Sequence, residues 1–134
     1  MMKKRIFVSG QEAAEIIQDH TTVATIGMTL VSASETILKA IEKRFLETKS
    51  PNHLTLVHSC GQSDRDRGIQ HFAHEDMLER IIGGHWGLQP RMMKLIAENK
   101  ILAYCIPQGQ FAQLFRSMAG GEPGKITKVG LGTF

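Results

Sequence analysis

Short apolar runs alternate along this chain with amphipathic stretches of helical length, and this alternation limits its possible folds more than any other feature. Candidate strands lie at 22–26, 54–58, 80–84 and 101–106, each separated from the next by a helical or loop segment. Strands joined through helices run parallel, because a tight turn can connect only antiparallel neighbours. The sequence therefore predicts an α/β protein with an open parallel sheet and helices on both faces.

Helices are expected beside these strands: after Ser9, at 33–47, at 72–78 as a short helix, after Pro90, and at 110–118. Ser9 with Glu12, and Ser32 with Glu35, have the spacing of a capping box, in which each side chain bonds the other residue's backbone N–H. Pro90 fits a first helical turn, where no backbone N–H is needed. Beyond Gly120 the pattern fades, so 1–134 is expected to be one domain that is cut short.

Composition places the chain among soluble globular proteins, with 42% hydrophobic and 22% charged residues. No apolar run is long enough to cross a bilayer, and the basic start at 1–5 lacks the apolar core of a secretory signal, so we expect a cytoplasmic protein. The net charge of +3 is scattered, which argues against nucleic-acid binding. Cys60 and Cys105 lack metal-ligand spacing and are expected to be reduced thiols.

Ligands of open α/β proteins bind at the carboxyl ends of the strands, which here are followed by 27–29, 59–61, 84–86 and 107–109. Gln108 follows the most apolar strand, where its amide could donate to a developing oxyanion. The alternative, favoured by the spacing alone, is a polar residue that caps a helix or faces solvent. His85 and Trp86 could form one side of a ligand-binding site. They could equally well be a packed aromatic residue and a hydrogen-bonded histidine with a structural role.

Other polar clusters fit known chemistry less well. His71 and His74 lack the i, i+4 spacing of the zinc helix motif, so no metal site is expected. The alternating charges at 64–67 favour pairing with one another over phosphate binding. Neither a nucleotide-binding glycine loop nor a nucleophile elbow is present. Residue patterns alone thus indicate an α/β domain with a site at its strand ends.

Several segments, taken in order, resemble the amino-terminal region of family I coenzyme A transferases of the propionate and acetate type: 42–48, Arg67-Gly68, 72–75, Gly84-His85-Trp86, 98–100, Gln108-Gly109 and 127–134. The resemblance runs along essentially the whole chain. It implies the open α/β fold of these enzymes, which is similar to that of sugar-phosphate isomerases. It also implies transfer of CoA between an acyl-CoA and a short-chain carboxylate, as in short-chain fatty acid and ketone body metabolism.

In this family a glutamate attacks the thioester, and covalent relay through that residue splits one hard step into easier ones. The resemblance makes Gln108 the oxyanion donor. Substrate contacts are expected at residues that follow the strands: Gly27, Met28, Gly84, His85 and Gly109. A CoA thioester is the expected substrate, with no other cofactor. Met28 and the residues after it replace the small residues usual in the family at that turn.

The family's nucleophilic glutamate lies in a later region, so we expect it to be absent from this chain. Glu75 and Glu98 match amino-terminal positions and are not expected to be nucleophiles. The missing partner is a carboxy-terminal half or a second subunit, and we expect a homo-oligomer. Four alternatives stay open: an inactive fragment, one subunit of a split enzyme, a non-catalytic remnant acting as an interaction module, and a sugar-phosphate isomerase or sugar-sensing domain.

Overall fold

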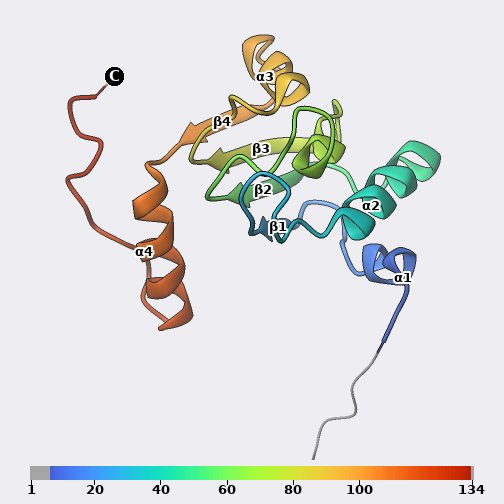
Figure 1. Ribbon diagram of the computed structural model, residues 1–134, viewed down its shortest axis with the longest axis horizontal. Helices are drawn as coiled ribbons and strands as arrows, with labels where there is room; N and C mark the ends of the chain where they lie inside the picture. Colours follow the sequence, from blue (N-terminus) through green and yellow to red (C-terminus); the bar gives the residue numbers. More distant parts are fainter. Residues whose placement is uncertain (1–6, 134) are drawn as a thin grey trace, which may run out of the picture.

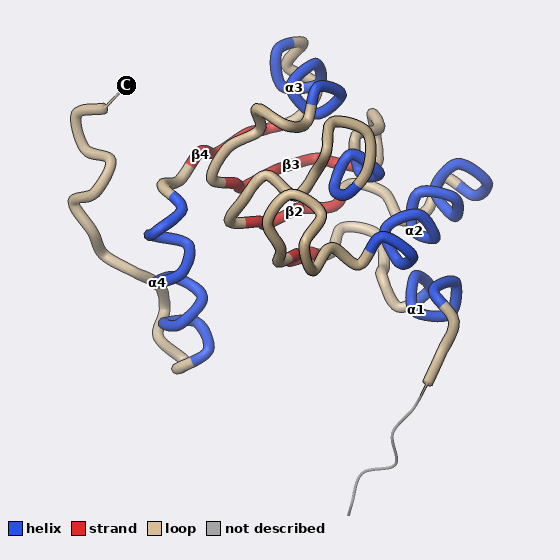
Figure 2. Tube along the Cα trace, viewed as in Figure 1, coloured by secondary structure: helices blue, strands red, loops and turns tan. Residues whose placement is uncertain are grey.

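The computed structural model describes residues 7–133, and a four-stranded parallel sheet in the order β1-β2-β3-β4 forms its centre (Figures 1 and 2). The strands are β1 (Thr22–Thr25), β2 (Leu54–His58), β3 (Leu78–Gly83) and β4 (Leu102–Cys105). The predicted fold class, an open parallel α/β sheet, is confirmed. All four predicted strands are found: β2 has the expected bounds, and the others differ by one or two residues. The basic start at 1–5 and Phe134 lie outside the described residues.

The helices are α1 (Gly10–Glu15), α2 (Glu35–Thr48), the 3₁₀ helix η1 (Gly68–Phe72), α3 (Pro90–Ala97) and α4 (Gln108–Ala119). The capping box before α1 is confirmed: the Glu12 N–H donates to Ser9 Oγ at 3.2 Å, and the Ser9 N–H donates to Glu12 Oε2 at 2.7 Å. Pro90 is the first residue of α3, as predicted. Within the described range 7–133, no helix combines the length and apolarity needed to cross a bilayer.

The second predicted capping box, Ser32 with Glu35, is wrong. Helix α2 begins at Glu35 itself, one residue after its N-cap Ser34, so Glu35 cannot take the third position that a capping box requires. Ser32 lies in the preceding turn with φ +64°. The Glu35 carboxylate instead accepts a bond from the Gly68 N–H at 3.0 Å, which ties α2 to η1.

The short helix predicted at 72–78 is also wrong. A 3₁₀ helix ends at Phe72, and the chain then turns through Asp76, whose φ of +67° interrupts any helix. The carbonyl oxygens of Asp76 and Met77 accept bonds from the N–H groups of His53 and Leu54, at 2.8 and 2.9 Å. These bonds align the segment with the start of β2, a long-range pairing that local helical spacing does not reveal.

One face of the sheet builds the core. Val23, Leu56, Ile81 and Ala103 lie side by side in register and therefore point to the same face. These four join the core cluster formed with α1, α2, η1 and α3 through buried residues of those helices: Ala14, Leu38, Ile41, Phe45, Ile69, Phe72 and Met92. The helices that contribute to the core thus cover a single face.

The expectation of helices on both faces is not met among residues 7–133. Thr22, Ala24, Leu102 and Tyr104 point to the second face, are exposed, and take no part in the core cluster. Topology explains the difference. The strands follow one another across the sheet in sequence order, and successive right-handed crossovers in one direction all fall on the same face. Helix α4 starts at the carboxyl edge of the sheet and stands apart from α1, α2 and α3 (Figure 1).

Candidate functional site

The turns after the four strands lie next to one another at the carboxyl edge of the sheet. The turn after β1 is tied to the end of β2, because the Thr29 N–H donates to the Gly61 carbonyl oxygen at 3.2 Å. This turn begins at Gly27, whose φ is +143° and whose added Cβ would lie 2.7 Å from the Val31 carbonyl oxygen. Both facts require glycine there. Met28 follows with 62% of its surface exposed.

The ends of β2, β3 and β4 meet at Gly84. A Cβ on Gly84 would collide with the Ser59 carbonyl oxygen and would lie 2.5 Å from Gln108 Cγ. The Gln108 side chain therefore rests directly on the backbone of Gly84. Two residues predicted from different strand ends, Gly84 and Gln108, are in contact because Gly84 has no side chain.

Gln108 is the first residue of α4, not a residue of the loop before it. The N-cap is Pro107, and no side chain caps this helix, so the alternative in which Gln108 caps the helix does not hold. Gln108 is exposed, and its amide makes no hydrogen bond to any residue of the described chain. Gly109 follows it, and a Cβ there would meet no atom within 4 Å. The side-chain N–H groups of Gln108 are thus unpaired within the described chain, and the space next to Gly109 is open.

His85 reaches from the end of β3 toward the end of β2. A Cβ on Gly61 would lie 2.7 Å from His85 Nε2, so the imidazole ring packs on the Gly61 backbone. The Gly87 N–H donates to His85 Nδ1 at 3.2 Å. Because Nδ1 accepts, the neutral ring carries its proton on Nε2. His85 therefore presents an N–H donor at the edge where the strand ends meet.

His58, the last residue of β2, is a buried part of this edge that the sequence did not single out. Its Nδ1 lies 2.7 Å from the Cys60 carbonyl oxygen and must donate to it, while its Nε2 accepts from Trp86 Nε1 at 3.2 Å. Burial lowers the pKa of His58 and outweighs the bond to the Cys60 carbonyl oxygen, which raises it. Because Nε2 accepts from Trp86, the His58 ring is neutral. Trp86 is thereby a hydrogen-bonded residue that packs, partly buried, against the core.

Two buried glutamines near this edge were also missed by sequence reasoning. Gln62 and Gln89 are fully buried, and neither side-chain amide has a hydrogen-bond partner among residues 7–133. Gln89 Nε2 would lie 3.1 Å from a Cβ on Gly61. Buried amides without partners are uncommon in folded proteins. The signal in the sequence that could have identified both glutamines is their position shortly after the polar ends of β2 and β3.

His71 and His74, considered above as metal ligands, are held by carboxylates. His71 Nδ1 contacts Glu42 Oε2, and His71 Nε2 lies 2.9 Å from Glu35 Oε1. His74 Nε2 lies 2.6 Å from Glu42 Oε1. Among the residues that the structure describes, no group of three or more histidine, cysteine or acidic side chains is arranged to hold a metal ion. This network links α2 to η1.

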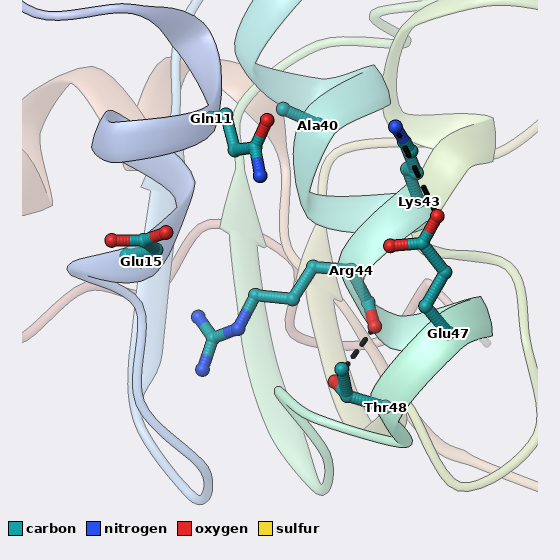
Figure 3. Close-up of a pocket in the computed structure, with 7 residues that line it drawn as sticks. All are labelled: Gln11, Glu15, Ala40, Lys43, Arg44, Glu47 and Thr48. Atoms are coloured by element: carbon teal, nitrogen blue, oxygen red, sulfur yellow. Dashed lines mark hydrogen bonds and ion pairs between the residues drawn. The ribbon is translucent and has the colours of Figure 1, made fainter.

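A separate cavity of about 280 Å³ lies between α1 and α2 (Figure 3). Most of the residues that line it are polar or charged: Gln11, Glu15, Lys43, Arg44, Glu47 and Thr48, together with Ala40. Arg44 Nη1 donates to the carbonyl oxygens of Ala14 and Ile17, at 2.8 and 2.7 Å, and so joins the end of α1 to α2. None of the predicted site residues lines this cavity, and its arginine has a structural task.

The carboxylates around His71 should make stability fall in acid. Burial opposes ionisation of Glu42, but hydrogen bonds from His74 and His71 outweigh it and hold the pKa below the ordinary value of 4.5. The pKa of Glu35 is lowered in the same way, by His71 and the Gly68 N–H against burial. A carboxyl whose pKa is depressed by folding contributes stability above its unfolded pKa and loses it as pH falls through the folded pKa.

We therefore expect the free energy of unfolding to decrease below about pH 4.5. Glu42→Gln should flatten this decrease, because it removes one of the depressed carboxyls. Glu47→Gln is the matched control on the exposed side of α2, where the carboxylate pairs with the exposed Lys43. Urea unfolding at pH 6, 5, 4 and 3 measures the slopes. Equal slopes for the wild type and Glu42→Gln would contradict the assignment.

Known proteins similar to this chain are CoA-transferases, although no family model matches it. Acetate CoA-transferase YdiF from Escherichia coli strain K12 is 36% identical over 129 residues, which make up 95% of this chain and 24% of the relative. Caffeate CoA-transferase from Acetobacterium woodii is 38% identical over 129 residues, 96% of this chain and 25% of the relative.

The structural match is equally extensive. The crystal structure of the acyl-CoA transferase YdiF from Escherichia coli O157:H7, in a thioester complex with CoA, has a TM-score of 0.88 at 37% identity. The match covers 95% of this chain and 26% of that one. The chain thus spans about a quarter of the length of the relatives it matches. In sequence and fold, nearly the whole chain is thus similar to one segment, about a quarter in length, of these CoA-transferases.

Proposed function

We propose that this chain is the amino-terminal portion of a short-chain acyl-CoA:carboxylate CoA-transferase of the acetate, propionate or 3-oxoacid class. In this proposal it supplies the oxyanion donor of the active site, and a glutamate from outside these 134 residues supplies the nucleophile. The substrates are a CoA thioester and a free carboxylate, with no further cofactor. The class of substrate rests on the relatives, which are named acetate and caffeate CoA-transferases, and on the CoA thioester in the structural neighbour.

The observation that carries the proposal is the free amide of Gln108. Attack of a carboxylate on a thioester carbonyl places negative charge on the carbonyl oxygen. A preorganised N–H donor at that oxygen stabilises the transition state more than the ground state. Gln108 is suited to this task because its side chain rests on Gly84, is exposed, and has no partner among residues 7–133. The open space beside Gly109 leaves room for a thioester.

Other residues at the same edge fit subsidiary tasks. The Nε2–H of His85 can donate to a carboxylate or thioester oxygen, since its Nδ1 is already occupied by the Gly87 N–H. Gly27 and Met28 belong to a turn that is fixed to the end of β2 through Thr29. The exposed Met28 offers an apolar, adaptable surface to an acyl chain. These assignments follow from position and donor type.

The two glutamates that match amino-terminal family positions support a nucleophile from elsewhere. Glu75 accepts a bond from Lys100 Nζ at 2.8 Å, shortly before the start of β4, and Glu98 is the C-cap of α3, in the turn that leads into that strand. Both therefore belong to the amino edge of the sheet, opposite Gln108. The nucleophile would come from the rest of the transferase or from a second subunit. We also propose a homo-oligomeric, cytoplasmic enzyme of short-chain fatty acid or ketone body metabolism.

A chimera tests the proposed function. In it this chain replaces the matching segment of acetate CoA-transferase YdiF, and the product is called the YdiF chimera below. We expect the purified chimera to transfer CoA from acetyl-CoA to propionate, because each half of the site is then present. Unaltered YdiF is the positive control. A chimera that folds, as judged by circular dichroism and its thermal transition, yet transfers no CoA would contradict the proposal.

A further inference from the structure

A cavity of about 470 Å³ lies at the carboxyl edge of the sheet, between the end of β4 and the segment 129–133. Helix α4 leads away from β4, and the chain then turns back (Figure 1). A Cβ on Gly130 would lie 3.8 Å from Pro107 Cγ, so the returning segment lies close to the turn before α4. The walls of the cavity include Cys105, Ile106 and Pro107 from the end of β4, and Val129, Leu131 and Thr133 from the returning segment.

This cavity borders the proposed oxyanion donor. Gly84 belongs to its lining, and a Cβ on Gly84 would lie 2.5 Å from Gln108 Cγ. Pro107, another lining residue, immediately precedes Gln108. A thioester whose carbonyl oxygen accepts from the Gln108 amide can therefore place one of its two substituents in the cavity. Met28 follows β1, at the other end of the strand order, and is a more distant apolar surface.

The lining suits a hydrocarbon group better than the CoA arm of a thioester. Among the described lining residues, only Cys105 and Thr133 have a side chain that can donate a hydrogen bond, and both are paired. Cys105 Sγ donates to the Gly84 carbonyl oxygen at 3.5 Å, and Thr133 Oγ1 donates to that of Gly130 at 2.8 Å. The CoA arm contains amide groups, and an amide that is buried without a partner costs binding free energy. The acyl chain has no such groups.

We propose that this cavity, called the acyl cavity below, binds the acyl chain of the CoA thioester and favours apolar acyl groups larger than acetyl. The inference rests on the proposed function, from which it takes its substrate. The cavity volume lies within the range of about 300–1,000 Å³ that is typical of small-molecule sites. Each methylene group that leaves water strengthens binding about fourfold, so the chimera should have a kcat/KM roughly tenfold higher for butyryl-CoA than for acetyl-CoA.

Two matched phenylalanine variants in the YdiF chimera test the inference. Val129→Phe places a ring in the acyl cavity, whereas Ile126→Phe adds the same ring at a fully exposed position of the same segment, outside the cavity lining. We expect Val129→Phe to lower kcat/KM for butyryl-CoA by about tenfold or more, and that for acetyl-CoA by less than about threefold. Ile126→Phe should leave both values nearly unchanged. Equal losses for the two thioesters in Val129→Phe would overturn the inference.

Alkylation of Cys105 gives a readout that needs no catalysis. Cys105 is exposed and lines the acyl cavity, whereas Cys60 is partly buried and does not line it, so Cys60 is the internal reference. The Gln108→Ala variant of the chimera is treated with iodoacetamide, and labelling is mapped by mass spectrometry. Butyryl-CoA at about ten times its Kd should slow labelling of Cys105 about tenfold, because bound protein is protected. Desulfo-CoA, which has no acyl group, should protect Cys105 much less.

Equal protection of Cys105 by butyryl-CoA and desulfo-CoA would overturn the inference. A Cys105 that is not labelled without ligand would overturn it as well, because another part of the transferase would then fill the acyl cavity. Protection needs no catalysis, so an inactive chimera in which butyryl-CoA protects Cys105 would contradict only the proposed function.

Discussion

Replacing Gln108 with alanine in the YdiF chimera should lower kcat for CoA transfer by about a hundredfold or more, as loss of one oxyanion donor does in other enzymes. The amide is the free donor that rests on Gly84 at the meeting point of the strand ends. KM should change much less, because the bond strengthens chiefly as charge develops on the thioester oxygen. Steady-state kinetics with acetyl-CoA and propionate measure both quantities.

Gln113→Ala is the matched control, since Gln113 is another exposed glutamine of α4. Both variants should keep the thermal midpoint of the chimera, because neither side chain is buried. If Gln108→Ala keeps kcat within a few-fold of the parent, the oxyanion role is wrong. The oxyanion role is equally wrong if the variant does not fold, and Gln108 would then have a structural role.

The second large effect is the absence of activity in the isolated 134-residue chain. We expect no measurable transfer from acetyl-CoA to propionate, because covalent catalysis needs a nucleophile and the amide of Gln108 is a poor one at neutral pH. Two glutamates that match amino-terminal positions of the family, Glu75 and Glu98, belong to the opposite edge of the sheet from Gln108. A coupled assay with the YdiF chimera as positive control measures this.

Activity of the isolated chain above the uncatalysed background would contradict the proposal that the nucleophile lies elsewhere. The Gln108→Ala variant of the same chain distinguishes activity of the chain itself from activity of a contaminating host transferase. Contaminating activity would persist in that variant, whereas activity of the chain itself would decrease.

Elements with local signals could be predicted from the sequence. Strand β2 has the predicted bounds because its apolar run is short and lies between polar residues at 52–53 and 59. The capping box at Ser9 also matched, since its bonds join residues only three apart. The start of α3 follows from Pro90, which supplies no backbone N–H.

Elements that depend on distant contacts could not be predicted. The segment after Phe72 has helical spacing, but it pairs with His53 and Leu54 at the start of β2. Glu35 has capping-box spacing, yet it binds Gly68 and His71 instead. The sheet has one covered face because of its strand order, and no local pattern contains that order.

The candidate site was partly predictable for a geometric reason. Residues that follow parallel strands share one edge of the sheet, so Gly27, Gly84 and Gln108 come to the same edge. Their catalytic roles remain predictions. The bond between His58 and Trp86 could not be foreseen, because it joins residues that are 28 positions apart.

The most direct test of the central claim is to locate the covalent intermediate. The YdiF chimera is mixed with acetyl-CoA, treated with borohydride to reduce the glutamyl-CoA thioester, digested, and mapped by mass spectrometry. We expect one reduced glutamate in the portion contributed by YdiF and none within the 134 residues of this chain, with the yield of adduct strongly reduced by Gln108→Ala. A reduced glutamate at any position within the 134 residues would contradict the claim that the nucleophile lies outside this chain.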